Sequence, residues 1–204
     1  MAIIFGDFDT TGFWEDCEYA AEHYVENPPT DELIIELELR LGYKIPRSYI
    51  ELANTQNGGS PNNTCCPTDS PTSWAEDHIA ITGIYSIGKF AHYSLGGSMN
   101  SKFWIDEWGY PPIGIYFADC PSAGHDMIAL DYRDCGKSGE PCVVHVDQEC
   151  GYQITKIADT FEQFIRKLQP DDNFNDDEVT LEPGQVKSVW IDPEFKAKLE
   201  RGEL

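Results

Sequence analysis

The chain has 204 residues, with 36 Asp and Glu against 14 Lys and Arg, and its formal net charge is −22. This length suits one sizeable domain with extensions better than two full domains. Because so negative a field repels phosphate backbones, we expect no nucleic-acid binding. No apolar run approaches the ~20 residues that cross a bilayer, so we expect no membrane span.

Residues 1–27 form an acidic leader rich in aromatic side chains. The first Lys or Arg is Arg40, and eleven acids precede it. Apolar residues in the leader follow roughly helical spacing and predict a short helix that packs on the rest of the protein: Phe13, Trp14, Cys17, Ala20, Ala21 and Tyr24. Pro28-Pro29 then ends the segment.

Two helices are predicted next. Thr30 is a suitable N-cap for the first helix, and Gly42 suits the residue just past its end. Its apolar stripe is Leu33, Ile34, Leu37 and Leu41. The second helix begins near Pro46, a favourable first-turn residue, and ends before residues 57–59, Asn-Gly-Gly.

The middle of the chain predicts strands. Residues 60–74 are rich in Pro, Asn, Thr and Ser and predict a surface loop, and a β-branched strand follows over 79–87. Segments 113–117 and 127–132 predict a hairpin, and 142–147 a further strand. The expected fold is therefore α+β, with a mainly antiparallel meander packed with a pair of N-terminal helices and a C-terminal helix.

The C-terminal helix has the clearest pattern. Asp159 and Glu162 match a reciprocal capping arrangement at its start. The apolar repeat that follows is Phe161, Phe164, Ile165 and Leu168. Residues 170–204 predict an acidic linker and then a short terminal helix from Asp192-Pro193.

Several segments between 28 and 168 together resemble the SUKH superfamily, which includes the yeast cell-wall assembly regulator and many bacterial immunity proteins. Residues 41–49, LGYKIPRSY, are similar to the family's Leu-Gly-x-x-Leu-Pro-x-x-Tyr signature, and Asn-Gly-Gly follows at 57–59. The hairpin 114–131 with Gly124-His125-Asp126 at its turn, the stretch 139–147 and the helix around 157–165 continue the likeness in the same order.

The resemblance implies a SUKH-type domain over residues 28–169, with helices packed on an antiparallel sheet and no enzymatic activity as the typical case. Many bacterial relatives neutralise a toxin, often a nuclease, by binding it. The leader and the tail lie outside the likeness.

Charge and aromatic residues indicate where a partner would bind. A basic partner favours carboxylates for fast association and exposed aromatics as buried anchors. The best cluster is expected in a loop between strands: Phe103, Trp104, Asp106, Glu107 and Trp108. The second is at the hairpin turn: Ser122, His125 and Asp126. Two alternatives stay open, since the two Trp side chains could instead fill the core and the acidity could simply maintain solubility.

Catalytic and metal sites are disfavoured by the sequence. The odd count of seven cysteines and the lack of a basic N-terminal region indicate free thiols in a cytoplasmic protein. A zinc set of Cys120, His125, Cys135 and Cys142 lacks the standard spacing, so we expect no metal and no cofactor. His125-Asp126 is a typical turn pair rather than an acid–base pair.

Two functions follow from these patterns. The first is an immunity protein whose acidic surface covers the basic cleft of a bacterial toxin, such as a nuclease. The alternative is a non-catalytic scaffold or regulatory module that recruits partners through the leader and tail.

Overall fold

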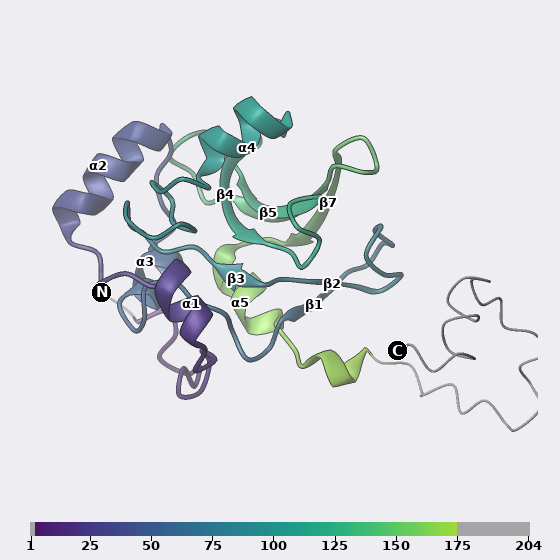
Figure 1. Ribbon diagram of the computed structural model, residues 1–204, viewed down its shortest axis with the longest axis horizontal. Helices are drawn as coiled ribbons and strands as arrows, with labels where there is room; N and C mark the ends of the chain where they lie inside the picture. The colour runs from purple at the N-terminus through teal and green to yellow at the C-terminus, as the bar shows by residue number, and fades with distance from the viewer. Residues whose placement is uncertain (1–2, 175–204) are drawn as a thin grey trace, which may run out of the picture. The chain divides into compact units, whose positions relative to one another are not determined.

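The computed structural model describes residues 3–174 (Figure 1). Its centre is an antiparallel sheet in which each strand pairs with the next along the chain. The strands are β3 (Gly83–Ile84), β4 (Gly114–Asp119), β5 (Asp126–Asp131), β6 (Cys142–Asp147) and β7 (Gln153–Ala158). The predicted α+β fold with an antiparallel meander is confirmed.

Two strand predictions were wrong. The expected loop 60–74 contains β1 (Cys65–Pro67), which pairs with β2 (His78–Ala80) in a separate two-stranded sheet. The single strand expected over 79–87 is divided, because the chain changes partner: Ile81 N–H donates to the Thr64 carbonyl at 3.0 Å, and Thr82 N–H donates to the Asp119 carbonyl at 2.8 Å. Strand β7 was not predicted, and four of its six residues are half-buried or exposed.

The helices are α1 (Glu18–His23), α2 (Asp31–Leu41), α3 (Arg47–Ala53), α4 (Ser101–Trp108) and α5 (Phe161–Lys167), and a 3₁₀ turn, η1 (Asp171–Asn173), follows. The predicted start and end of α2 are confirmed, since Thr30 Oγ1 accepts from Leu33 N–H at 3.3 Å and Gly42 has a φ of 79°. Helix α3 begins after Pro46, as predicted. None of the helices in residues 3–174 is long and apolar enough to cross a membrane.

The cap of α5 differs by one residue from the prediction. Thr160, not Asp159, is the N-cap, and its Oγ1 accepts from Gln163 N–H at 3.2 Å. In return, Gln163 Oε1 accepts from Asp159 N–H at 3.1 Å. Glu162 is engaged elsewhere, with Arg166 at 2.9 Å. The reciprocal cap therefore uses a Thr-x-x-Gln frame.

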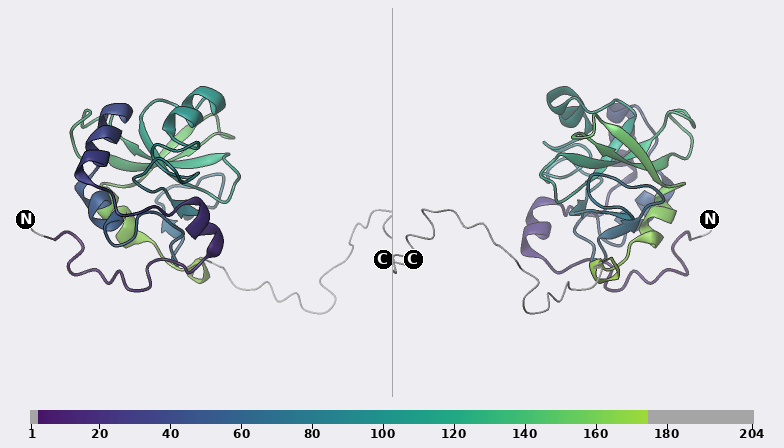
Figure 2. Two further views of the ribbon diagram at one scale, coloured as in Figure 1. Left: turned by 60° about the vertical axis from the view of Figure 1, so that its left-hand side comes forward. Right: turned by 90° about the vertical axis from the view of Figure 1, so that its right-hand side faces the viewer.

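Helices α4 and α5 lie on opposite sides of the strands in both views of Figure 2. On the α5 side, Tyr49 stacks on Phe161 with ring centroids 4.5 Å apart, and Phe117 packs edge-on against Phe161 and Phe164. These buried aromatics anchor α3 and α5 on the sheet. The opposite side is where the candidate surface lies.

The leader packs into the same core. Phe5 and Phe13 are buried, and the Tyr24 hydroxyl donates to both carboxylate oxygens of Asp119, at 3.0 and 2.9 Å. Helix α1 starts later than expected, because the chain around Trp14 is extended and forms a bridge to Pro61. The predicted terminal helix after residue 192 lies outside the described residues.

Candidate partner-binding surface

The aromatic and acidic segment that we expected in a loop forms helix α4, so that expectation was wrong. Asn100 caps the helix: its Oδ1 accepts from the backbone N–H groups of Lys102 at 2.8 Å and Phe103 at 3.3 Å. Gly109 follows the last turn with a φ of 75°, the left-handed conformation common past a helix end. The Asn before and the Gly after this segment were the sequence signals of a helix.

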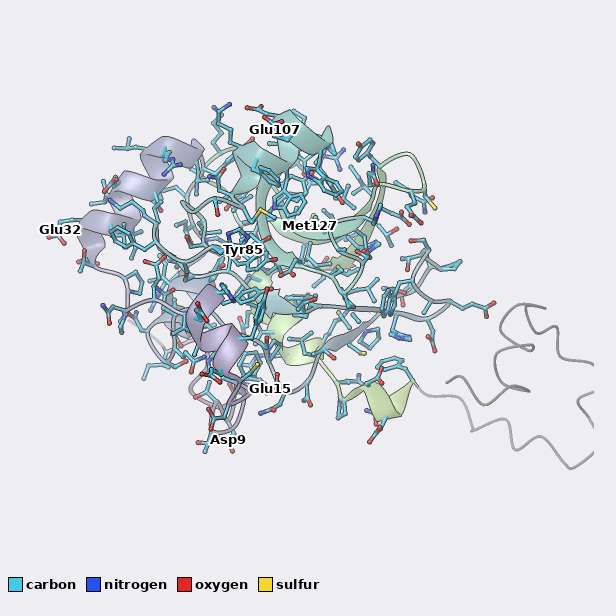
Figure 3. All side chains as sticks on the ribbon, in the orientation of Figure 1. Asp9, Glu15, Glu32, Tyr85, Glu107 and Met127 are labelled. Carbon is cyan, nitrogen blue, oxygen red and sulfur yellow. The ribbon has the colours of Figure 1, made fainter. Side chains whose placement is uncertain are left out.

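Helix α4 turns one side inward and the other outward. Trp104 is only 2% exposed and belongs to the core. Asp106 and Glu107 are exposed, and Figure 3 shows Glu107 at the outer surface of α4. Phe103 and Trp108 are half-buried at the boundary. Carboxylates and partly exposed aromatic rings therefore lie next to one another on the outer side of this helix.

The turn between β4 and β5 packs against the end of α4. The ring centroids of His125 and Trp108 are 6.0 Å apart. Tyr110, which follows the helix, donates its hydroxyl to the Gly124 carbonyl at 2.8 Å. The two residue clusters that the sequence kept separate thus form one continuous surface.

Within the turn, the predicted residues differ in exposure. His125 is exposed and Ser122 half-buried, whereas Asp126 is only 3% exposed. Ser122 Oγ accepts from Asp126 N–H at 3.1 Å, and Asp126 Oδ2 lies 2.7 Å from His145 Nε2. Asp126 therefore holds the turn from inside, and His125 is the group that a partner can reach. We call Phe103, Asp106, Glu107, Trp108, Ser122 and His125 the α4–turn surface.

Glu149 extends the α4–turn surface and was missed from the sequence. Its Oε1 lies 3.5 Å from His125 Nδ1, and it is exposed. Trp74, 40% exposed, comes from the distant 68–77 loop. Together these segments line a pocket of about 180 Å³ formed by Ser73, Trp74, Ser122, His125, Asp126 and Glu149. No local pattern predicts this, because the residues meet only through tertiary packing.

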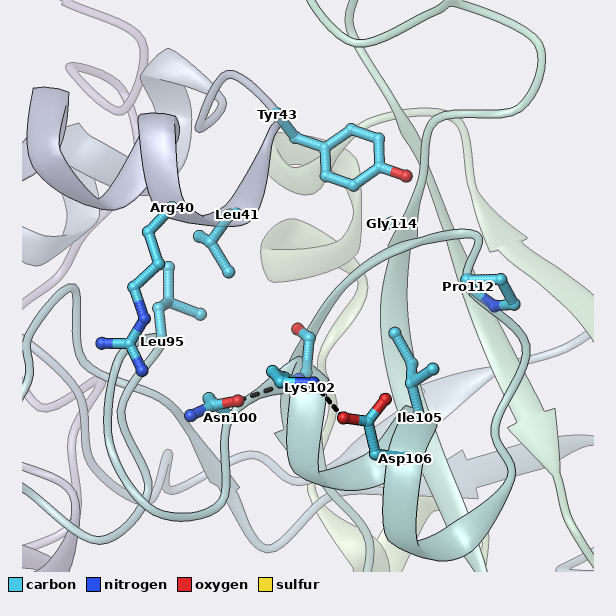
Figure 4. Close-up of a pocket in the computed structure, with 11 residues that line it drawn as sticks. Arg40, Leu41, Tyr43, Leu95, Asn100, Lys102, Ile105, Asp106, Pro112 and Gly114 are labelled. Carbon is cyan, nitrogen blue, oxygen red and sulfur yellow. Dashed lines mark hydrogen bonds and ion pairs between the residues drawn. The ribbon is translucent and has the colours of Figure 1, made fainter.

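A second hollow lies on the α2 side of α4 (Figure 4). It has a volume of about 270 Å³, and its walls combine Leu41, Tyr43, Leu95 and Ile105 with Arg40, Lys102 and Asp106. Lys102 forms an ion pair with Asp106 one helical turn away, and Arg40 Nη1 donates to the Gly96 carbonyl at 3.1 Å. Both cations are thus engaged within the fold, and the hollow adds apolar area beside the acidic face.

Three buried thiols have raised pKa values. Burial raises the pKa of Cys120 well above its usual range, and the carboxylates of Asp126 and Asp119 raise it further. Burial also raises the pKa of Cys66 to about 12 and that of Cys65 in the same direction. Without a bound metal, these three side chains stay protonated at neutral pH and are poor nucleophiles.

The cysteine and histidine side chains that lie close together in the structure differ from the zinc set that was evaluated from the sequence. Cys120 lies near Asp126 and His145, all three buried. His125 and Cys135 are exposed and Cys142 is half-buried. The set of Cys120, His125, Cys135 and Cys142 is therefore not the cluster that the fold brings together.

Comparison with known proteins gives one family. No match is found among curated proteins. The sequence model of the SMI1 / KNR4 family (SUKH-1) matches residues 28–167. This segment runs from just before α2 to the last residue of α5, and it includes α4 and every strand of the described region. The match covers well over half of the 204 residues, so the chain belongs to the SMI1 / KNR4 family (SUKH-1).

Proposed function

We propose that this protein is an immunity protein: it binds a cognate bacterial toxin, a basic nuclease, and neutralises it by occlusion without catalysing a reaction. The binding site in this proposal is the α4–turn surface. One observation carries it: exposed carboxylates of Asp106 and Glu107 adjoin the half-buried rings of Phe103 and Trp108 on helix α4. Membership of the SUKH-1 family, to which immunity proteins belong, supports the same function.

The charge of the chain fits a basic partner. A nuclease holds a polyanion and so presents cations, and a net charge of −22 accelerates its capture. Asp106, Glu107 and Glu149 form the acidic part of the surface, and Lys102 alone on the outer side of α4 offsets them. Partly buried aromatic rings next to these charges supply the apolar anchors that set the lifetime of a complex.

The alternative, a scaffold that recruits partners, relied on the leader and the tail. Within the described residues, the leader is engaged with the domain: Phe5, Phe13 and Tyr24 are buried, and Glu26 Oε1 accepts from the N–H groups of Phe90 and Ala91 at 2.9 and 3.0 Å. A leader fixed in this way is poorly suited to recruit a partner. We therefore favour the immunity function.

Co-expression with the product of an adjacent toxin gene tests the proposal. We expect cells to survive, the toxin to stay intact and the two proteins to co-purify at low salt. Absence of both rescue and complex would contradict the proposal. Rescue with degradation of the toxin would contradict occlusion.

The double variant Asp106→Lys/Glu107→Lys assigns the surface in the same assay. Its matched control is Glu15→Lys/Asp16→Lys, which changes the charge equally at two adjacent, exposed acids. Figure 3 shows Glu107 at the top of the domain and Glu15 in its lower part. We expect rescue to fall only in the first variant. An equal loss of rescue in both variants would show that net charge, and not the α4–turn surface, determines the effect.

A further inference from the structure

Three different metal-ligating side chains converge behind the β4–β5 turn. Cys120, Asp126 and His145 each place one ligand atom within 4.8 Å of the others. The sheet register explains why. His145 pairs with Ile128, two positions from Asp126, so both side chains project to one face of the sheet. Ala118 also pairs with Ile128, and Cys120 lies two positions beyond it.

This cluster is buried and only partly satisfied. Cys120, Asp126 and His145 are 2%, 3% and 0% exposed. Asp126 Oδ2 lies 2.7 Å from His145 Nε2, but within residues 3–174 neither Asp126 Oδ1 nor His145 Nδ1 has a hydrogen-bond partner. A buried acceptor without a partner costs about 1–3 kcal/mol. A cation bound by the carboxylate would remove that cost at Asp126.

We propose that Cys120, Asp126 and His145 bind a thiophilic divalent cation, Zn²⁺. Thiolate, imidazole and carboxylate are the ligands that zinc uses, at about 2.0–2.3 Å. Ligand atoms at those lengths stand about 3.3–3.7 Å apart, so the cluster closes on an ion after small side-chain movements. One thiolate and one carboxylate also neutralise the charge of a divalent ion in this buried place.

The binding step needs no redox partner. The Cys120 S–H bond breaks, its proton passes to solvent and a sulfur–metal bond forms, with no change of oxidation state. At His145 the proton that Nε2 shares with Asp126 is transferred through solvent to Nδ1, so the ring stays neutral and the lone pair of Nε2 binds the metal. Three protein ligands leave a fourth position for water, as in many zinc sites.

One residue of this cluster also lines a surface pocket. Asp126 also lines the pocket of about 180 Å³ whose other walls include His125, Glu149 and Trp74. Glu149 and His125 are exposed at this pocket. An anionic carboxylate at the mouth of a pocket attracts a cation and raises its local concentration.

A second group, Cys65, His78 and Asp171, serves as the control. Its ligand atoms also lie within 4.8 Å, but Asp171 is exposed. His78 Nδ1 is already 2.8 Å from the carboxylate of Asp77. Nothing in this second group is both buried and without a partner, so we assign the metal to Cys120, Asp126 and His145.

Titration of the full, untagged chain with Co²⁺ as a spectroscopic substitute for zinc tests the proposal without any toxin. We expect one equivalent to bind, with the charge-transfer band of a cobalt–thiolate bond, and Zn²⁺ to displace it. Cys120→Ser should abolish the band. Asp126→Asn and His145→Gln should weaken binding by about tenfold or more, the loss that even outer-shell changes cause. Cys65→Ser should retain both.

The wild-type titration alone can overturn the proposal, so the test remains valid even if a variant fails to fold. Absence of a thiolate band at stoichiometric Co²⁺ would overturn it, since metal held only by acidic side chains gives no such band. A band that is lost in Cys65→Ser and kept in Cys120→Ser would place the metal in the other cluster and equally overturn it. Circular dichroism of each variant separates loss of binding from loss of fold.

Discussion

The inner and outer sides of helix α4 differ in how firmly the fold holds them. On the inner side, Trp104 is 2% exposed and its indole N–H donates to the Met99 carbonyl at 2.9 Å. On the outer side, Asp106 has one ion pair, with Lys102, and Glu107 is exposed. The difference indicates that inner residues determine stability, whereas outer residues can change for binding without loss of the fold.

The largest effect is expected from Trp104→Ala. Removal of this buried ring leaves a cavity and should lower the free energy of unfolding by ~3–5 kcal/mol. Urea denaturation measures it. The matched change Trp108→Ala removes a half-buried ring and should cost clearly less. Equal losses of unfolding free energy in the two variants would contradict the difference between the inner and outer sides of α4.

The buried layer should also show a pH dependence. Burial raises the pKa of Asp119 to about 7, although two hydrogen bonds from Tyr24 oppose the shift. This pKa is above the value of about 3.9 that Asp has in the unfolded chain, so between pH ~4 and ~7 the native state holds a proton that the unfolded state has lost. The contribution of Asp119 to the free energy of unfolding is therefore fully present below pH ~4 and is lost as the pH rises through ~7.

The variant Asp119→Asn removes that loss. The unfolding free energy of the wild type minus that of the variant should therefore fall between pH ~4 and ~7, by an amount on the order of 4 kcal/mol, and then stay level. Denaturant titrations of both proteins from pH 4.5 to 8.5 measure the difference. A difference that does not change with pH would contradict the buried, proton-binding role of Asp119.

The same contrast explains what the sequence could predict. Helices α2 and α5 have local capping residues and apolar stripes, and the β4–β5 hairpin consists of two largely apolar runs joined by clear turn residues, so local patterns were sufficient to predict them. The division of the strand after Ala80 depends on pairing with Thr64 and Asp119, which lie far away in sequence. Helix α4 also had a local signal, in Asn100 and Gly109, although the segment was predicted to be a loop between strands.

The candidate surface was only partly predictable for the same reason. Residue type suggested Asp106, Glu107 and His125, but exposure is a property of packing. Trp104 and Asp126 are of the same residue types as Trp108 and Asp106, yet they are buried. Glu149 approaches His125 only because β5 and β6 pair.

Charge reversal on the outer side should change binding and leave stability intact. For Asp106→Lys/Glu107→Lys, we expect association with the proposed toxin partner to slow by roughly tenfold at low salt and to depend less on salt. The free energy of unfolding should stay within about 0.5 kcal/mol of the wild type. Stopped-flow kinetics and urea denaturation measure the two. A large loss of stability would show that these residues also support the fold.

The smallest effect is expected from Lys102→Gln. This change removes one exposed ion pair with Asp106, worth about 0.3–0.5 kcal/mol, and makes the surface more negative. Association should become faster, within about a factor of three, through a stronger field. Slower association would indicate that Lys102 contacts an acidic group of the partner.

Hydrogen exchange of the complex with the proposed toxin partner tests the assignment of the α4–turn surface most directly. We expect amide exchange to slow on binding over residues 101–109 and 121–126 and to stay unchanged over α1 and α2. Protection confined to α1 or α2, with exchange over α4 and the β4–β5 turn unchanged, would contradict the assignment.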